Sequence, residues 1–117
     1  MSETEAMTER NQLEIQNGDG HVTMSVTRFT TGHLMVRLTD HGTSSCVSQI
    51  VIHQSTSLVS IWWGEKEYVY EVHDIMDVLA EFILTQSMGK VANWVKENNT
   101  MSEATQAFYR EKGLVGV

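Results

Sequence analysis

The sequence predicts an α+β domain, in which an antiparallel β-meander of five to six strands (residues 12–72) is followed by about three C-terminal α-helices packed on one face. Apolar and polar residues alternate from Leu13 to Val72, as in half-buried strands joined by short turns. From Asp74 onward the apolar residues recur at helical spacing instead. The length of 117 residues suits a single domain.

The first half of the predicted sheet begins after a polar stretch. Residues 1–11 are expected to form a flexible tail, and residues 12–117 the folded domain. Leu13 and Ile15 alternate with polar residues as the first strand, and Asn17-Gly18 then favours a type I′ hairpin turn because both residues adopt positive φ readily. Residues 21–29 and 34–39 continue the alternation and are the next two predicted strands.

The second half of the sheet is more apolar. Residues 46–53 carry Ile50 and Ile52 on one face but Val47 and Val51 on the other, a pattern typical of a central or doubly covered strand. Residues 58–63 and 67–72 are the last two strands, joined by a turn at 64–66. The inward face of the whole sheet is predicted to hold Leu13, Ile15, Val22, Met24, Val26, Leu34, Val36, Leu38, Ile50, Ile52, Val59, Ile61, Trp63, Tyr68 and Tyr70.

The first helix is expected to start after Asp74, whose carboxylate can cap the free amide groups. Its apolar residues span roughly 240° of the helix circumference, whereas a surface helix needs a stripe of only about 100°. This helix is therefore either enclosed by the sheet and the later helices or shared with a partner. The apolar positions are Ile75, Met76, Val78, Leu79, Ala80, Phe82, Ile83 and Leu84.

Two shorter helices complete the prediction. Gly89 is expected to interrupt the first helix, and residues 91–98 form the second. Thr100 and Glu103 have the spacing of a capping box for the third helix, which Gly113 is expected to terminate.

The charge distribution narrows the classes of partner. The formal net charge is −7, and residues 65–81 alone carry −5, because six carboxylates there face only Lys66. This balance disfavours nucleic acid, whose phosphates require clustered Lys and Arg. The single cysteine, Cys46, precludes an intrachain disulfide and fits a reducing cytoplasmic setting. The chain shows neither an apolar export segment at residues 1–12 nor a run of 18 apolar residues, so no membrane association is expected.

The carboxylates of residues 65–81 are the first candidate binding surface. On the outer face of a strand and along one strip of a helix, they would form one acidic band that attracts a basic protein. The alternative is an ordinary solvated face, with negative charge placed favourably at a helix N-terminus. The residues are Glu65, Glu67, Glu71, Asp74, Asp77 and Glu81.

A second candidate surface is apolar and lies on the face of the sheet predicted to point outward. A contiguous apolar patch around a tryptophan is typical of an interface. It is covered by the chain's own helices, by a second copy in a homodimer, or by a foreign partner. Its residues are Val47, Val51, Leu58, Trp62 and Val69.

No motif indicates catalysis, a cofactor or a metal. His73 and Asp77 share helical spacing, but the sequence supplies no further ligands at suitable spacing. Cys46 and His41 lack an identifiable third group that would orient a nucleophile and its base. The glycines are dispersed in turns, so no phosphate-binding loop is predicted.

The favoured hypothesis is a small, acidic, non-enzymatic protein-binding module, a homodimer that acts as an inhibitor or regulator of the kind mobile genetic elements and phages often encode. Its interface would combine Trp62 and Val69 with the six carboxylates. One alternative is a small-molecule binder or enzyme with a pocket between sheet and helices, lined by Trp63, Tyr68, Tyr70 and a histidine. The third hypothesis is DNA binding through the last two helices, with Thr105, Gln106 and Arg110 facing the duplex.

Overall fold

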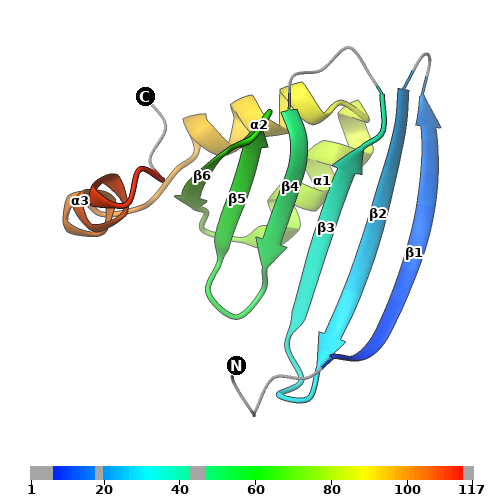
Figure 1. Ribbon diagram of the computed structural model, residues 1–117, viewed down its shortest axis with the longest axis horizontal. Coiled ribbons are helices and arrows are strands. Elements are labelled where there is room, and N and C mark those ends of the chain that lie inside the picture. Colours follow the sequence, from blue (N-terminus) through cyan, green and yellow to red (C-terminus); the bar gives the residue numbers. More distant parts are fainter. Residues whose placement is uncertain (1–6, 18–19, 43–46, 115–117) are drawn as a thin grey trace.

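The computed structural model describes residues 7–17, 20–42 and 47–114. Within them, six antiparallel strands form one sheet in chain order (Figure 1). They are β1 (Met7–Asn17), β2 (Gly20–Phe29), β3 (Leu34–Asp40), β4 (Val47–His53), β5 (Leu58–Trp63) and β6 (Lys66–Glu71). Three helices follow, which confirms the predicted α+β class and the meander.

The first strand starts earlier than the sequence suggested. β1 begins at Met7, so residues 7–11 belong to the sheet instead of the expected tail, and they pair with the end of β2. This mostly polar stretch can pair because the hydrogen bonds between strands are made by backbone N–H and C=O groups and do not require an apolar pattern. Residues 1–6, 18–19 and 43–46, including Cys46, lie outside the described part of the chain.

One face of the sheet carries the core. The pairing register aligns Val36 with Val26 and Ile52, and Ile61 with Ile50 and Tyr68. Because side chains alternate along a strand, these residues all project to the same side. The predicted inward face is confirmed for the buried residues Val22, Val36, Leu38, Ile50, Ile52, Val59, Ile61 and Tyr70.

A β-bulge at the start of β4 reverses the predicted orientation of Val47. Val47 was expected to point outward, but it is only 2% exposed and belongs to the core. The register shifts between Val47 and Gln49, which pair with Trp63 and Trp62 respectively. The extra residue, Ser48, reverses the alternation at the start of β4 and turns Val47 inward.

The first helix, α1 (Ile75–Thr85), begins as predicted. Asp74 is its N-cap, and the Asp74 carboxylate accepts a hydrogen bond of 2.9 Å from the backbone N–H of Met76. The helix ends at Gln86, which adopts a left-handed conformation with φ 49°. Ser87 then caps α2 (Met88–Glu97). The expected break at Gly89 was wrong, because the chain turns three residues earlier and Gly89 lies inside α2.

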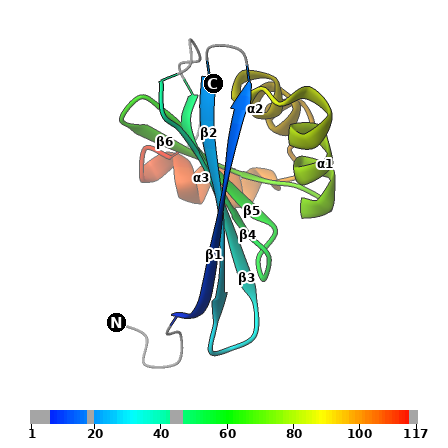
Figure 2. The ribbon, with the colours of Figure 1, turned by 90° about the vertical axis from the view of Figure 1, so that its right-hand side faces the viewer.

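Helices α1 and α2 lie on the same face of the sheet, and the opposite face carries no helix in front of its strands (Figures 1 and 2). Four side chains of α2 are buried in the core: Met88, Val91, Ala92 and Val95. From α1 only Val78 and Phe82 are buried. We call the helix-free side the open sheet face.

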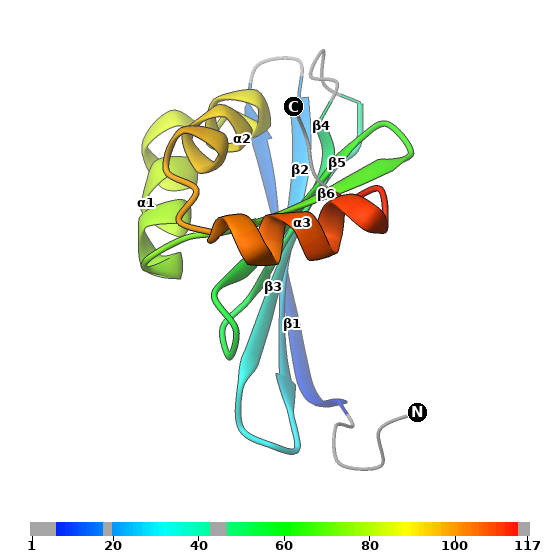
Figure 3. The same ribbon diagram turned by 90° about the vertical axis from the view of Figure 1, so that its left-hand side faces the viewer.

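The third helix, α3 (Glu103–Glu111), lies beyond the β6 edge (Figure 3). It buries none of its residues. Its anchors are backbone bonds on either side: Thr100 N–H donates to the Glu71 carbonyl at 2.8 Å, and Val69 N–H donates to the Leu114 carbonyl at 2.6 Å. These bonds occupy part of the edge that β6 would otherwise leave unpaired.

The cap of α3 differs from the predicted capping box. Ser102 is the N-cap, and its hydroxyl accepts a bond from the Thr105 N–H at 3.3 Å. The Thr100 backbone N–H instead donates to the Glu71 carbonyl at the end of β6. This hydrogen bond to the sheet takes the place of the predicted capping box. Gly113 stands just past the helix with φ 74°, as expected for the terminating glycine.

Candidate functional site

Helix α1 has two apolar faces. Val78 and Phe82 point into the core and are 0% and 2% exposed. At about 100° per residue, Met76, Ala80, Ile83 and Leu84 occupy a separate arc of roughly 100° on the outward side. We call these four residues the α1 apolar stripe.

The α1 apolar stripe is open to solvent. Leu84 is 81% exposed, Ile83 68% and Met76 61%, and Ala80 is also exposed. Phe108, on α3, is also an exposed large hydrophobic residue. The sequence predicted that α1 is either enclosed by the sheet and the later helices or shared with a partner. The first alternative is wrong, because the sheet and α2 cover only the inward side of α1.

Carboxylates border the stripe on one side. Asp77 is exposed and lies about 20° around the helix from Leu84, and the half-buried Glu81 lies further round. The opposite border of the stripe runs into Ile75 and Leu79, which pack against the core. Asp74 stands at the N-terminus of the same helix, where its carboxylate is engaged as the cap. The stripe thus has one acidic and one apolar margin.

The other predicted site residues lie elsewhere. Trp62 pairs with Glu67, Ser60 with Val69 and Leu58 with Glu71, all on the open sheet face. Glu65 is exposed in the turn between β5 and β6. The structure therefore divides the predicted surface in two, with Asp74, Asp77 and Glu81 on the helix layer and the rest on or beside the open sheet face.

The apolar patch predicted on the open sheet face is smaller than expected. Val47 is in the core, and Val51 and Val69 are each only 6% exposed. Leu58 and Trp62 are half-buried. Figure 2 shows α1 and α2 on one face of the sheet. Trp62 lies in register with Glu67 on the other face, and its side chain is partly accessible to solvent.

The aromatic residues proposed to line an internal pocket are instead packed. Trp63 and Tyr68 lie against the core with ring centroids 5.7 Å apart, and Lys96 Nζ stands 5.4 Å from the centre of the Trp63 ring. Tyr70 is 4% exposed, and its hydroxyl finds no hydrogen-bond partner among the described residues. Burial, with the nearby Tyr68 adding to it, raises the pKa of Tyr70, so this hydroxyl stays neutral at physiological pH.

The remaining candidates concern a metal site, a membrane span and the third helix. Among residues 7–17, 20–42 and 47–114, no cluster of three or more His, Cys, Asp or Glu could hold a metal ion. No helix in those same ranges is long and apolar enough to cross a membrane. In α3, the Gln106 amide donates to the Met101 carbonyl at 2.9 Å, so it is engaged within the protein.

Sequence reasoning did not single out the exposed apolar residues of α1 as a site. Met76, Ile83 and Leu84 were counted as apolar helix positions, but the carboxylates beside them were chosen as the site. The sequence did contain an indication of this surface, because the apolar arc of the first helix spans about 240° and is wider than one packed face requires. Comparisons with protein-family models, with curated proteins and with solved structures found no match.

Proposed function

We propose that this protein is a non-enzymatic protein-binding module, an inhibitor or regulator that docks a basic partner on α1. The observation that carries the proposal is the α1 apolar stripe, with Leu84, Ile83 and Met76 at 81%, 68% and 61% exposure on one rigid helix. A contiguous stripe of this kind contributes nothing to the fold and gains about 25 cal/mol per Å² of apolar surface when a partner covers it.

The acidic margin defines the chemistry of the partner. Asp77 and Glu81 lie along the stripe, within a segment whose net charge is −5 from six carboxylates and Lys66. An amphipathic helix that lays its apolar residues on the stripe, and carries Lys or Arg on the Asp77 side, would satisfy both features. The proposed setting is the reducing cytoplasm expected from the single cysteine.

A second copy of the chain is the competing occupant. A homodimer through the stripe would bring Asp77 and Glu81 of both copies to one interface, where like charges repel. That repulsion favours a foreign basic partner over the homodimer expected from the sequence. Light scattering of the protein alone distinguishes the two, and a monomer is the expected result.

The test is capture of a partner from a lysate by immobilised protein, followed by affinity measurement with the purified partner. Replacing Ile83 and Leu84 together by Ser should weaken binding by at least about 100-fold, since two interface anchors are lost at roughly tenfold or more each. Both side chains are exposed, so stability should change by no more than about 0.5 kcal/mol per substitution. D77N/E81Q should weaken binding more at low than at high salt.

Phe108→Ser is the matched control, because Phe108 is 56% exposed but lies on α3, beyond the sheet edge. This variant should bind the partner as tightly as the unaltered protein. The proposal is wrong if I83S/L84S binds normally, or if Phe108→Ser is impaired to the same extent.

A further inference from the structure

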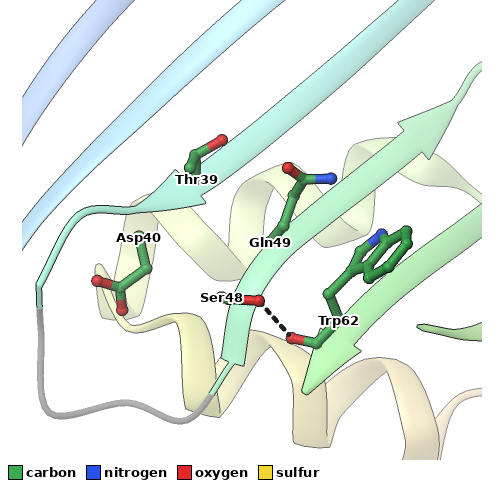
Figure 4. A pocket seen from close by; sticks show the side chains of 5 residues that line it. All are labelled: Thr39, Asp40, Ser48, Gln49 and Trp62. Atoms are coloured by element: carbon green, nitrogen blue, oxygen red, sulfur yellow. Dashed lines mark hydrogen bonds between the residues drawn. The ribbon is translucent and has the colours of Figure 1, made fainter. Parts of the chain in front are cut away.

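The open sheet face contains a shallow pocket of about 380 Å³ that is separate from α1 (Figure 4). Its volume lies within the range of small-molecule sites. All five lining residues are half-buried, so each presents part of its surface to solvent. They are Thr39, Asp40, Ser48, Gln49 and Trp62.

Three of these residues form a cross-strand row. The register pairs Thr39 of β3 with Gln49 of β4, and Gln49 with Trp62 of β5. Neighbouring strands lie about 4.8 Å apart, so a hydroxyl, an amide and an indole follow one another over roughly 10 Å. Figure 4 shows Gln49 between Thr39 and Trp62, with Asp40 at the other end of the pocket.

The bulge on β4 holds the floor of the pocket in place. The Ser48 hydroxyl lies 2.9 Å from the Gly64 carbonyl and 3.3 Å from the Trp62 carbonyl, and can donate to either. These contacts fix the backbone that carries Trp62. At the far end, the Asp40 carboxylate accepts a bond of 2.8 Å from the Gly42 N–H. These bonds hold the backbone at both ends of the lining in place.

The polar groups of the row remain available. No hydrogen bond of the described chain engages the Gln49 amide or the Thr39 hydroxyl. The amide supplies two donors and one acceptor oxygen, and the hydroxyl supplies one donor together with acceptor lone pairs. Within the described part of the chain, a ligand can bond to both groups without displacing a protein hydrogen bond.

The charge of the lining excludes several ligand classes. Asp40 is the only ionisable group among the five, so phosphates, nucleotides and carboxylates would meet a negative charge and no cation. A quaternary ammonium ligand is best held by a cage of several aromatic rings, whereas Trp62 is the single ring here. A neutral ligand with both an apolar face and many hydroxyl groups fits best.

We propose that this pocket binds a neutral oligosaccharide. The C–H face of one sugar ring stacks on the Trp62 indole, and hydroxyl groups of that ring and the next bond to Gln49 and Thr39. The row of polar groups extends along the sheet face, which suits a chain of sugar rings. A nucleobase, by contrast, carries its hydrogen-bonding groups around one small planar ring system and does not extend along the row.

The test is an NMR titration that follows the indole N–H signals of the three tryptophans, with Trp62 assigned from Trp62→Phe. The probes are maltotriose, cellotriose and chitotriose, alongside uridine and tetramethylammonium. At least one trisaccharide should shift the Trp62 signal saturably, with a dissociation constant of roughly 1 mM, as expected for a shallow site. Trp62→Ala, which has no indole signal at this position, is followed through its backbone amide signals and should lose binding. Gln49→Ala should weaken binding about tenfold.

Glu67→Gln is the control on the same face, because Glu67 pairs with Trp62 in the register but does not line the pocket. It should leave the titration unchanged. The proposal is overturned if no trisaccharide shifts the Trp62 signal, or if only uridine or tetramethylammonium does. Shifts that persist unchanged in Trp62→Ala and Gln49→Ala would likewise overturn it, because binding would then lie elsewhere.

Discussion

Replacing Phe82 by Ala is expected to lower the free energy of unfolding by about 3–5 kcal/mol, the usual cost of truncating a fully packed aromatic side chain. Phe82 is 2% exposed and, with the fully buried Val78, is one of two α1 side chains inside the core. Its removal leaves a cavity where α1 meets the core, and the helix has only Val78 left as a buried anchor. Urea denaturation followed by far-UV circular dichroism measures the loss.

The neighbouring residue provides the matched control. Ile83 is one position further along the same helix but 68% exposed, so Ile83→Ala should change stability by no more than about 0.5 kcal/mol. Equal losses in the two variants would show that α1 is covered on both sides. A larger loss for Ile83→Ala would mean that the helix is rotated by roughly one residue, or about 100°.

Trp63→Ser is expected to lower the free energy of unfolding by about 3 kcal/mol, at the low end for a core aromatic because its ring is only partly buried. Trp63 packs against the core beside Tyr68, and Lys96 lies over its ring. Trp62→Ser, on the open sheet face, should cost less than about 1 kcal/mol. Thermal or urea unfolding of both variants tests the assignment of the two faces, and the reverse order would show that they are exchanged.

The strand pattern predicted the antiparallel meander, although the pattern alone did not fix the order of the strands, which the structure shows to follow the chain. Alternation from Leu13 to Val72 with short turns leaves few topologies other than neighbouring antiparallel strands. The orientation of Val47 could not be predicted in this way. Its outward assignment followed from strict alternation, and the extra residue at Ser48 shifts the register by one.

For helix α1, the apolar periodicity of the sequence did not predict which side faces the core. Its wide apolar arc indicated two packed sides, but the sequence does not specify which arc faces the core. That choice depends on where the helix lies relative to α2 and the sheet. Similarly, Thr39, Gln49 and Trp62 lie 10 and 13 positions apart along the chain. Only the strand register brings them into one row, so the sequence alone did not identify the pocket.

The most direct test of the central claim is a methyl NMR spectrum recorded with a soluble paramagnetic agent, before and after the captured partner is added. In the free protein, the Met76, Ile83 and Leu84 methyl signals should broaden strongly, while those of the fully buried Val78 should not. Saturation with the partner should protect the three stripe residues and leave Ala104 and Ala107, exposed on α3, accessible. Stripe methyls that are already protected in the free protein, or that stay accessible in the complex, would contradict docking on α1.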